Sequence, residues 1–192
     1  MSDLNNLQGM ATLVREPLWR YRNQLFANVL PEAIAAWLFD PSSLTARIIA
    51  ACPGRFHVEI VAQQWQRAYL NETQRLGMPA QQIALVREVY LYCNDTPWVF
   101  ARTVIPRGTL TGKQKHLAYL GSRPLGAVLF ADPQMHRDPI EVACLKAQHK
   151  LYAKATARLA VVPGEIWGRR SVFYLADKPL LVNEIFLPTM LV

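Results

Sequence analysis

Residues 167–192 read Trp-Gly-Arg-Arg-Ser-Val-Phe-Tyr-Leu-Ala-Asp-Lys-Pro-Leu-Leu-Val-Asn-Glu-Ile-Phe-Leu-Pro-Thr-Met-Leu-Val, and the rest of the chain is organised around them. Residues 171–176 and 179–187 are rich in β-branched and aromatic side chains, which are enriched in strands. Between them, Asp177 and Lys178 form a short polar link. The stretch therefore predicts two antiparallel strands joined by a two-residue turn.

One acidic residue stands out in this hairpin. In the predicted register Ser171 pairs with Glu184, and alternation places Glu184 on an otherwise apolar strand face. Burying a carboxylate is costly unless the group is paired, and functional sites are places where such groups gather. Two interpretations stay open. Glu184 either touches water near a sheet edge or pairs with Arg169 or Arg170, or it belongs to a functional site.

Length and composition set the class of protein. The chain has 192 residues, and we expect a single domain over residues 1–192. Hydrophobic residues make up 52% and charged residues 18%, a balance that argues against disorder. The formal net charge is +7, yet the sequence has no run of five basic residues and no basic–aromatic repeat. Such a charge suits nucleic acid, an anionic membrane surface, an anionic small molecule or solubility alone, and without basic runs we expect no nucleic acid. We also expect a monomer.

The cysteines and the N-terminal sequence bear on the compartment. Cys52, Cys93 and Cys144 are odd in number and lack CxxC spacing, so buried thiols in a reducing cytosol are expected rather than disulfides or zinc. The start lacks the features of a signal peptide, and the apolar segment 33–39 is too short to span a bilayer. We expect a cytoplasmic protein without stable membrane association.

Periodicity outlines the rest of the chain. Residues 55–64 alternate and predict a half-buried strand, whereas 66–80 is polar and predicts a connection. His149 lies with apolar residues on one face of a predicted helix, which favours packing over catalysis. Helical spacing predicts helices that begin at Pro17 and at Pro31, and helices over 44–51, 110–120 and 141–159.

A second hairpin carries two arginines. Residues 83–92 and 97–105 flank Asn94-Asp95, and a two-residue turn there places Arg87 directly opposite Arg102. Like charges across a strand pair repel, so a bound anion or a nearby acid between the two guanidinium groups would relieve the repulsion. Glu88 is not expected to do so, because alternation points it to the other face. The alternative is that one arginine reaches the rim, or that the register slips by one residue.

Motifs for nucleotide, hydrolase and metalloprotease chemistry are absent. The sequence contains no GxGxxG, GxxxxGK[ST], GxSxG or HExxH. The four histidines and three cysteines lack metal-ligand spacing. We expect no metal and no cofactor, so any chemistry rests on arginines, Glu184 and the shape of a pocket.

Several fragments together resemble chorismate pyruvate-lyase. The similarity runs in order over roughly residues 37–192. The fragments that carry it are Arg87-Glu88, Pro97-Trp98, Arg102-Thr103-Val104-Ile105-Pro106, Pro124-Leu125-Gly126, Arg137-Asp138, Trp167-Gly168-Arg169-Arg170-Ser171, Lys178-Pro179-Leu180-Leu181 and Glu184-Ile185-Phe186-Leu187-Pro188.

The resemblance implies an α+β fold, with an antiparallel β-sheet, helices packed on it, and an internal ligand cavity under flaps. It implies that Arg87 holds the ring carboxylate of the ligand and that Glu184 meets the ring hydroxyl. Leu125 and Leu44 match further ligand contacts, and Arg102 matches an arginine near the site. Two departures concern residues 142–163, which are longer than is usual, and Ala101, where glycine is familiar.

The implied activity is the elimination of pyruvate from chorismate to give 4-hydroxybenzoate for ubiquinone synthesis, without a cofactor. On this hypothesis Arg102 or Arg170 attends to the enolpyruvyl group, and the flat product leaves slowly. The alternative is a non-catalytic domain of the same fold that senses small aromatic acids, as in some bacterial transcription regulators. Those regulators carry a preceding DNA-binding region, and the roughly 40 residues before the shared part lack a helix-turn-helix pattern.

Overall fold

Two long hairpins form the centre of one antiparallel sheet. The computed structural model describes residues 15–25 and 30–190. Within them the strands are β1 (Arg20–Tyr21), β2 (Phe56–Arg67), β3 (Ile83–Cys93), β4 (Thr96–Pro106), β5 (His136–Arg137), β6 (Glu141–Lys146), β7 (Glu165–Leu175) and β8 (Lys178–Phe186). Their order is β1-β6-β7-β8-β4-β3-β2, with β5 beside β7.

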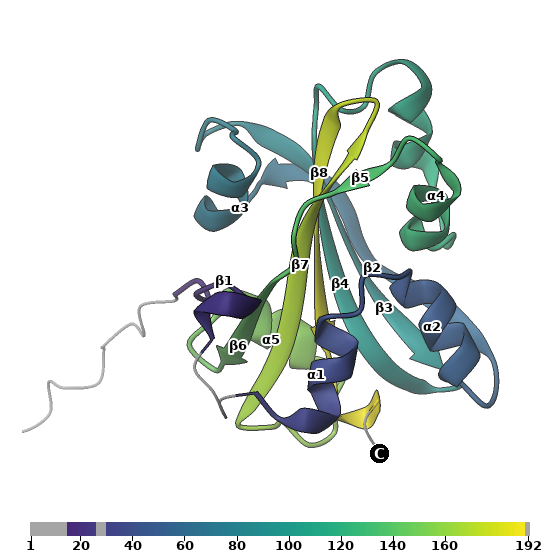
Figure 1. The fold of residues 1–192 in the computed structure, drawn as a ribbon, viewed down its shortest axis with the longest axis vertical. Helices are drawn as coiled ribbons and strands as arrows, with labels where there is room; N and C mark the ends of the chain where they lie inside the picture. The colour runs from purple at the N-terminus through teal and green to yellow at the C-terminus, as the bar shows by residue number, and fades with distance from the viewer. Residues whose placement is uncertain (1–14, 26–29, 191–192) are drawn as a thin grey trace, which may run out of the picture.

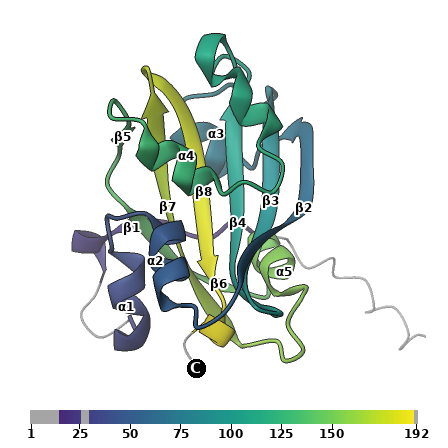
Figure 2. The ribbon, with the colours of Figure 1, turned by 90° about the vertical axis from the view of Figure 1, so that its right-hand side faces the viewer.

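Helices cover both faces of this sheet, so the fold is α+β as expected. The α-helices are α1 (Glu32–Leu38), α2 (Leu44–Ala51), α3 (Leu70–Arg75), α4 (Leu125–Ala131) and α5 (Lys150–Thr156); the 3-10 helices are η1 (Arg22–Gln24), η2 (Gly112–Tyr119) and η3 (Pro188–Met190). Helices α2 and α4 lie on one face, and α3 and α5 lie on the other (Figures 1 and 2). Each face of the central strands therefore meets its own set of helices.

The closing hairpin has the predicted faces but a different register. Its turn residues are Ala176 and Asp177, at φ 49° and 60°, one residue earlier than predicted. Such a turn needs positive φ at both positions, which matches the twist of the two strands. Ser171 consequently pairs with Val182 rather than with Glu184, and Arg169 pairs with Glu184. Because the shift is even, every side chain stays on its predicted face.

The second hairpin turns at Asn94-Asp95 as predicted, but its register slips. The pairing shifts between Leu91 and Tyr92, where Leu91 meets Val99 and Tyr92 meets Pro97. The extra residue in β4 is a β-bulge, and a shift by one residue turns every later side chain to the other face. Arg102 therefore lies opposite Glu88. The expectation that it lies opposite Arg87 is wrong, and the alternative of a slipped register is confirmed.

The shorter elements agree with the sequence in part. The helix over 44–51 is confirmed as α2, the helix that begins near Pro31 as α1, and the strand over 55–64 as β2. The helix over 110–120 is the 3-10 helix η2, with Leu117 and Leu120 buried. The segment 66–80 contains α3, which the polar composition concealed.

Two predicted helices are wrong. Residues 141–159 divide into β6 and α5, because the apolar start of the segment pairs with β7 and tertiary pairing overrides helical spacing. The helix expected from Pro17 is replaced by β1 and η1 over the described residues up to 25, since β1 pairs with β6. Val29, which completed that spacing, lies outside the described residues.

The cysteines also differ from expectation. Cys52 and Cys93 form a disulfide, with a Cα–Cα distance of 5.6 Å, and Cys144 is a free thiol. The bond joins the C-cap of α2 to the end of β3. Sequence spacing gave no sign of it, because the fold brings together two residues 41 positions apart. Within the described ranges, no helix has the length and apolar character needed to cross a membrane.

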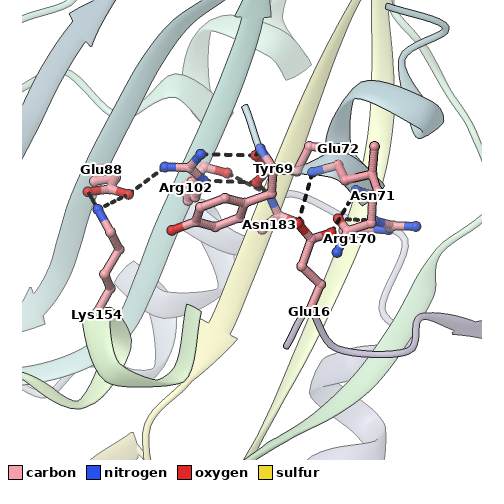
Figure 3. A network of polar contacts seen from close by, with 10 residues as sticks. Glu16, Tyr69, Asn71, Glu72, Glu88, Arg102, Lys154, Arg170 and Asn183 are labelled. Carbon is pink, nitrogen blue, oxygen red and sulfur yellow. Dashed lines mark hydrogen bonds and ion pairs between the residues drawn. The ribbon is translucent and has the colours of Figure 1, made fainter. Parts of the chain in front are cut away.

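A buried ion network holds α3 and α5 against the sheet (Figure 3). The Arg102 guanidinium is 1% exposed and donates to both carboxylate oxygens of Glu72 on α3, at 2.8 and 2.9 Å. Its third bond goes to Glu88 at 2.6 Å, and Lys154 of α5 donates to the same carboxylate at 2.7 and 2.8 Å. The Tyr69 ring lies 4.1 Å from the Arg102 guanidinium carbon. The charges of this network are matched within it.

Breaking this network should destabilise the fold. We expect Arg102→Met to lower the free energy of unfolding by about 3–5 kcal/mol, because it leaves two buried carboxylates without their guanidinium. Urea unfolding followed by circular dichroism measures the change. The control is Lys146→Met, which removes a half-exposed ion pair with Glu165 and should cost under about 1 kcal/mol. Equal, small losses in both variants would contradict the role given to Arg102.

Candidate functional site

A cavity lies between the sheet and the helices α2 and α4. Four of the five residues expected at a ligand site line it: Arg87, Glu184, Leu125 and Leu44. The other lining residues are Thr45, Val58, Val89, Leu91, Ala101, Thr103, Pro124, Gly126, Leu129, Phe130, Arg137, Arg169, Phe173 and Val182. The cavity is thus apolar over most of its wall, with a few charged groups aimed into it, as is usual for small-molecule sites.

Local sequence closes the two helices over the cavity. The Ser43 hydroxyl caps α2 by accepting from the Ala46 N–H at 3.4 Å, which fixes the start of the helix beside Leu44. Pro124 precedes α4 and sets its first turn at Leu125. Gly126 then allows the helices to approach, since a Cβ at this position would lie 2.8 Å from the Thr45 hydroxyl. Leu44 and Leu125 therefore reach the cavity from adjacent helix starts.

Arg87 is a buried cation without an acidic partner. The residue is 2% exposed, and its guanidinium donates to the Gln63 side-chain oxygen at 3.0 Å and to the Arg123 carbonyl at 3.4 Å. Among the residues that the structure describes, no carboxylate pairs with it. Burial lowers the pKa of Arg87, but an arginine keeps its charge at neutral pH. An anion in the cavity would supply the missing partner.

Glu184 forms an ion pair in the cavity wall. The Arg169 Nε donates to Glu184 Oε2 at 2.6 Å, which confirms the expectation that Glu184 pairs with a neighbouring arginine. Arg169 also donates to the carbonyls of Trp37 at 3.0 Å and Asp40 at 2.7 Å, which holds it at the end of α1. The ion pair uses Oε2 of Glu184, and among the described residues no hydrogen bond to Oε1 is found. The carboxylate is therefore fixed in place without being fully occupied.

Arg137 is a cavity residue that sequence reasoning missed. It lies on the two-residue strand β5, beside Phe173 of β7, and its guanidinium carbon is 4.9 Å from that ring. Its hydrogen bonds go to neutral acceptors, the Ser171 hydroxyl at 3.1 Å and the Pro41 carbonyl at 3.1 Å. Burial lowers the pKa of Arg137 to about 10. The Arg137-Asp138 fragment was noticed only as part of a resemblance, because so short a strand has no periodicity.

The charges of the cavity do not balance. Three guanidinium groups (Arg87, Arg137 and Arg169) and one carboxylate (Glu184) line it, and the ion pair uses one of each. Two guanidinium groups remain without a carboxylate among the described residues. A buried cation is costly unless it is paired, so this site suits a ligand that brings two negative charges. Within the same ranges, no group of His, Cys, Asp and Glu side chains could hold a metal ion.

Two arginines expected near the ligand lie elsewhere. The β-bulge turns Arg102 to the face of α3, where Glu72 and Glu88 hold it. Arg170 also lies on that face (Figure 3). It donates to both oxygens of Glu141 at 3.1 and 3.0 Å. Neither residue lines the cavity, so the structure does not bring Arg102 or Arg170 to the expected ligand site. Buried carboxylate partners hold both arginines on the face of α3.

Comparison with known sequences finds a family that matches this chain. The sequence model of the family described as chorismate lyase matches residues 13–192. A probable chorismate pyruvate-lyase from Aromatoleum aromaticum is 43% identical over 164 residues, 84% of this chain and 88% of the relative. Another from Pseudomonas aeruginosa is 42% identical over 173 residues, 90% of this chain and 92% of the relative.

The fold is also shared with more distant proteins. The crystal structure of PhnF from Mycobacterium smegmatis superposes with a TM-score of 0.55 at 15% sequence identity. The superposition covers 78% of this chain and 65% of that chain. At this identity the likeness concerns the arrangement of the strands and helices alone.

The two sheet faces should respond differently to the same substitution. We expect Arg87→Met to leave the free energy of unfolding of the ligand-free protein within about 1 kcal/mol of the wild type, or to raise it. The reason is that methionine fills the space without a buried, unpaired charge. Urea unfolding of Arg87→Met and Arg102→Met under the same conditions compares their free energies of unfolding. A loss as large as that of Arg102→Met would mean that Arg87 serves the fold and not a ligand.

Proposed function

Because the chain belongs to the chorismate lyase family, we propose that it eliminates pyruvate from chorismate to give 4-hydroxybenzoate, which feeds ubiquinone synthesis. The observation that carries this proposal is the charge pattern of the cavity. Two guanidinium groups without carboxylate partners and one fixed carboxylate face a largely apolar space. Chorismate has two carboxylates, a hydroxyl and a largely apolar cyclohexadiene ring, and so complements each of these features.

The chemistry needs positioning more than it needs a reactive group. The ether bond between the ring and the enolpyruvyl group breaks, and its electron pair leaves on the enolpyruvyl oxygen. The ring carbon that bears the hydroxyl loses a proton, and the ring becomes aromatic. The enolpyruvate takes up a proton and becomes pyruvate. The elimination involves no external oxidant or reductant and aromatisation drives it, so we propose that no cofactor takes part.

We propose that Arg87 anchors the ring carboxylate, since a guanidinium can hold a carboxylate by two parallel bonds. Glu184 accepts a hydrogen bond from the ring hydroxyl and is itself held by Arg169. Leu44 and Leu125 pack on the ring and exclude water, which strengthens every charge interaction inside the cavity. The enclosure holds chorismate in one reactive conformer, and such orientation can supply a large part of the barrier reduction.

The direct test incubates the purified protein with chorismate and follows both products by chromatography. We expect equal amounts of pyruvate and 4-hydroxybenzoate. Arg87→Met should lower kcat/KM by at least about 100-fold and weaken 4-hydroxybenzoate binding, because the ring carboxylate loses its partner. The matched control is Arg55→Met, which removes an exposed arginine outside the cavity and should change neither.

Other outcomes would decide against the proposal. Intact chorismate together with tight binding of 4-hydroxybenzoate would show a non-catalytic domain that senses aromatic acids. Normal kinetics in Arg87→Met would remove Arg87 from the site. 3-Hydroxybenzoate in place of the 4-isomer would keep the lyase activity and correct the product.

Product release should be slow. Leu44 and Leu125 pack over the cavity from α2 and α4, and we propose that a bound aromatic ring is released when these helices move. We expect a burst of 4-hydroxybenzoate in the first turnover, followed by a slower steady state, in a stopped-flow experiment. Leu125→Ala should speed the steady state relative to the burst. A product off-rate far above kcat in the wild type would contradict this prediction.

A further inference from the structure

An open groove adjoins the cavity on the side of β5. Its wall includes Tyr21, Arg22, Phe39 and His136. Two residues, Phe130 and Arg137, line both the groove and the cavity. Arg137 therefore stands at the boundary between the enclosed space and the outside. A group bound to its guanidinium could lie in the cavity and still reach solvent through the groove.

The partners of Arg137 set it apart from its neighbours. Arg75 pairs with Asp138 and Glu141, Arg169 with Glu184, and Arg170 with Glu141. In the described part of the chain, Arg137 contacts no carboxylate and donates only to a hydroxyl and a carbonyl. The ring of Phe173 fixes its orientation. A held, half-buried guanidinium with neutral partners is prepared for an anion.

The order of the strands gives the direction of the ligand. Across this face, Arg87 lies on β3, Glu184 on β8 and Arg137 on β5, with β4 and β7 in between. Glu184 thus lies between the two unpaired arginines. Its negative charge also favours the charged form of Arg137, so the two groups are within electrostatic reach of each other.

The substrate carries its second carboxylate on a side group next to the hydroxyl. In chorismate the ring carboxylate and the hydroxyl stand on opposite ends of the ring, and the ether carbon is next to the carbon with the hydroxyl. If Arg87 holds the carboxylate and Glu184 the hydroxyl, the enolpyruvyl group projects sideways from the ring carbon beside the hydroxyl. Its carboxylate can then reach a cation near Glu184, and Arg137 on β5, beside β7, lies on the side of Glu184 away from Arg87.

We infer that Arg137 binds the carboxylate of the enolpyruvyl group at the boundary of the cavity, and that pyruvate leaves through the adjoining groove. This inference rests on the proposed function. It replaces Arg102 and Arg170, which lie on the other face of the sheet. Arg169 is a poorer candidate, because its Nε already donates to Glu184 and its Nη1 to the carbonyls of Trp37 and Asp40.

The placement also matters for the reaction. When the ether bond breaks, negative charge develops on the enolpyruvyl oxygen, and a nearby fixed cation stabilises that charge without reorganisation. Arg137 meets this need only for the substrate, because 4-hydroxybenzoate has no enolpyruvyl group. A loss of Arg137 should therefore separate turnover of chorismate from binding of the product.

The test compares Arg137→Met with the wild type. We expect kcat/KM for chorismate to fall about 10- to 100-fold, the loss of one charge-assisted contact, while the Kd of 4-hydroxybenzoate stays within about threefold. Inhibition by added pyruvate should weaken in the variant. Arg137→Lys, which keeps the charge, should recover part of the activity. Arg107→Met, an exposed arginine that lines neither space, is the control and should behave as the wild type.

Three results would overturn the inference. Full activity in Arg137→Met would show that Arg137 makes no contact that matters for turnover. A loss of 4-hydroxybenzoate affinity as large as the loss of turnover would show that Arg137 supports the product site. A lowered urea midpoint in Arg137→Met would show that Arg137 supports the fold. In that case the kinetic and binding measurements are repeated with Arg137→Lys, which keeps the charge. A wild type that neither converts chorismate nor binds 4-hydroxybenzoate would overturn the proposed function itself, before any variant is made.

Discussion

One extra residue in β4 governs the whole arrangement of charge. The bulge beside Leu91 shifts the pairing of the central hairpin, so that Arg87 and Arg102 point to opposite faces of the sheet. Without it, both guanidinium groups would compete for the same space. With it, one arginine joins acidic residues from α3 and β3, and the other enters the cavity. The sheet therefore separates a structural cation from a ligand-binding cation by a single backbone irregularity.

The two faces follow different electrostatic rules. On the face of α3 and α5, each buried charge meets an opposite charge, so the desolvation cost is offset within the protein. On the face of α2 and α4, the protein leaves two guanidinium groups without a carboxylate in the described ranges. The cost of burying them is offset only when an anion binds. The two unpaired guanidinium groups therefore have two effects: they lower the stability of the ligand-free protein slightly, and they favour binding of a dianion.

Sequence reasoning reached the parity of the strands but not their register. Alternation placed Glu184 on the correct face even though its predicted partner was wrong, because an even shift preserves the face. For Arg102 the shift was odd, and the prediction failed. The sequence also could not predict that Arg87 lacks an acidic partner, since its neighbours come from distant parts of the chain. Arg137 was missed because a two-residue strand gives no periodic pattern. Helix α3 was missed because its sequence is polar, although residues such as Glu72 are buried.

The disulfide between Cys52 and Cys93 gives the unfolded chain a loop that it would otherwise lack. In the chain-entropy account, closing a loop across 41 positions stabilises the fold by about 4 kcal/mol. Part of that gain is local, because the bond ties the end of α2, whose first turn carries Leu44, to the sheet. A thiol-rich medium would remove the loop, and the same chain would then hold its cavity wall only by packing. How firmly α2 closes the cavity therefore depends on whether the disulfide is oxidised or reduced, as well as on packing.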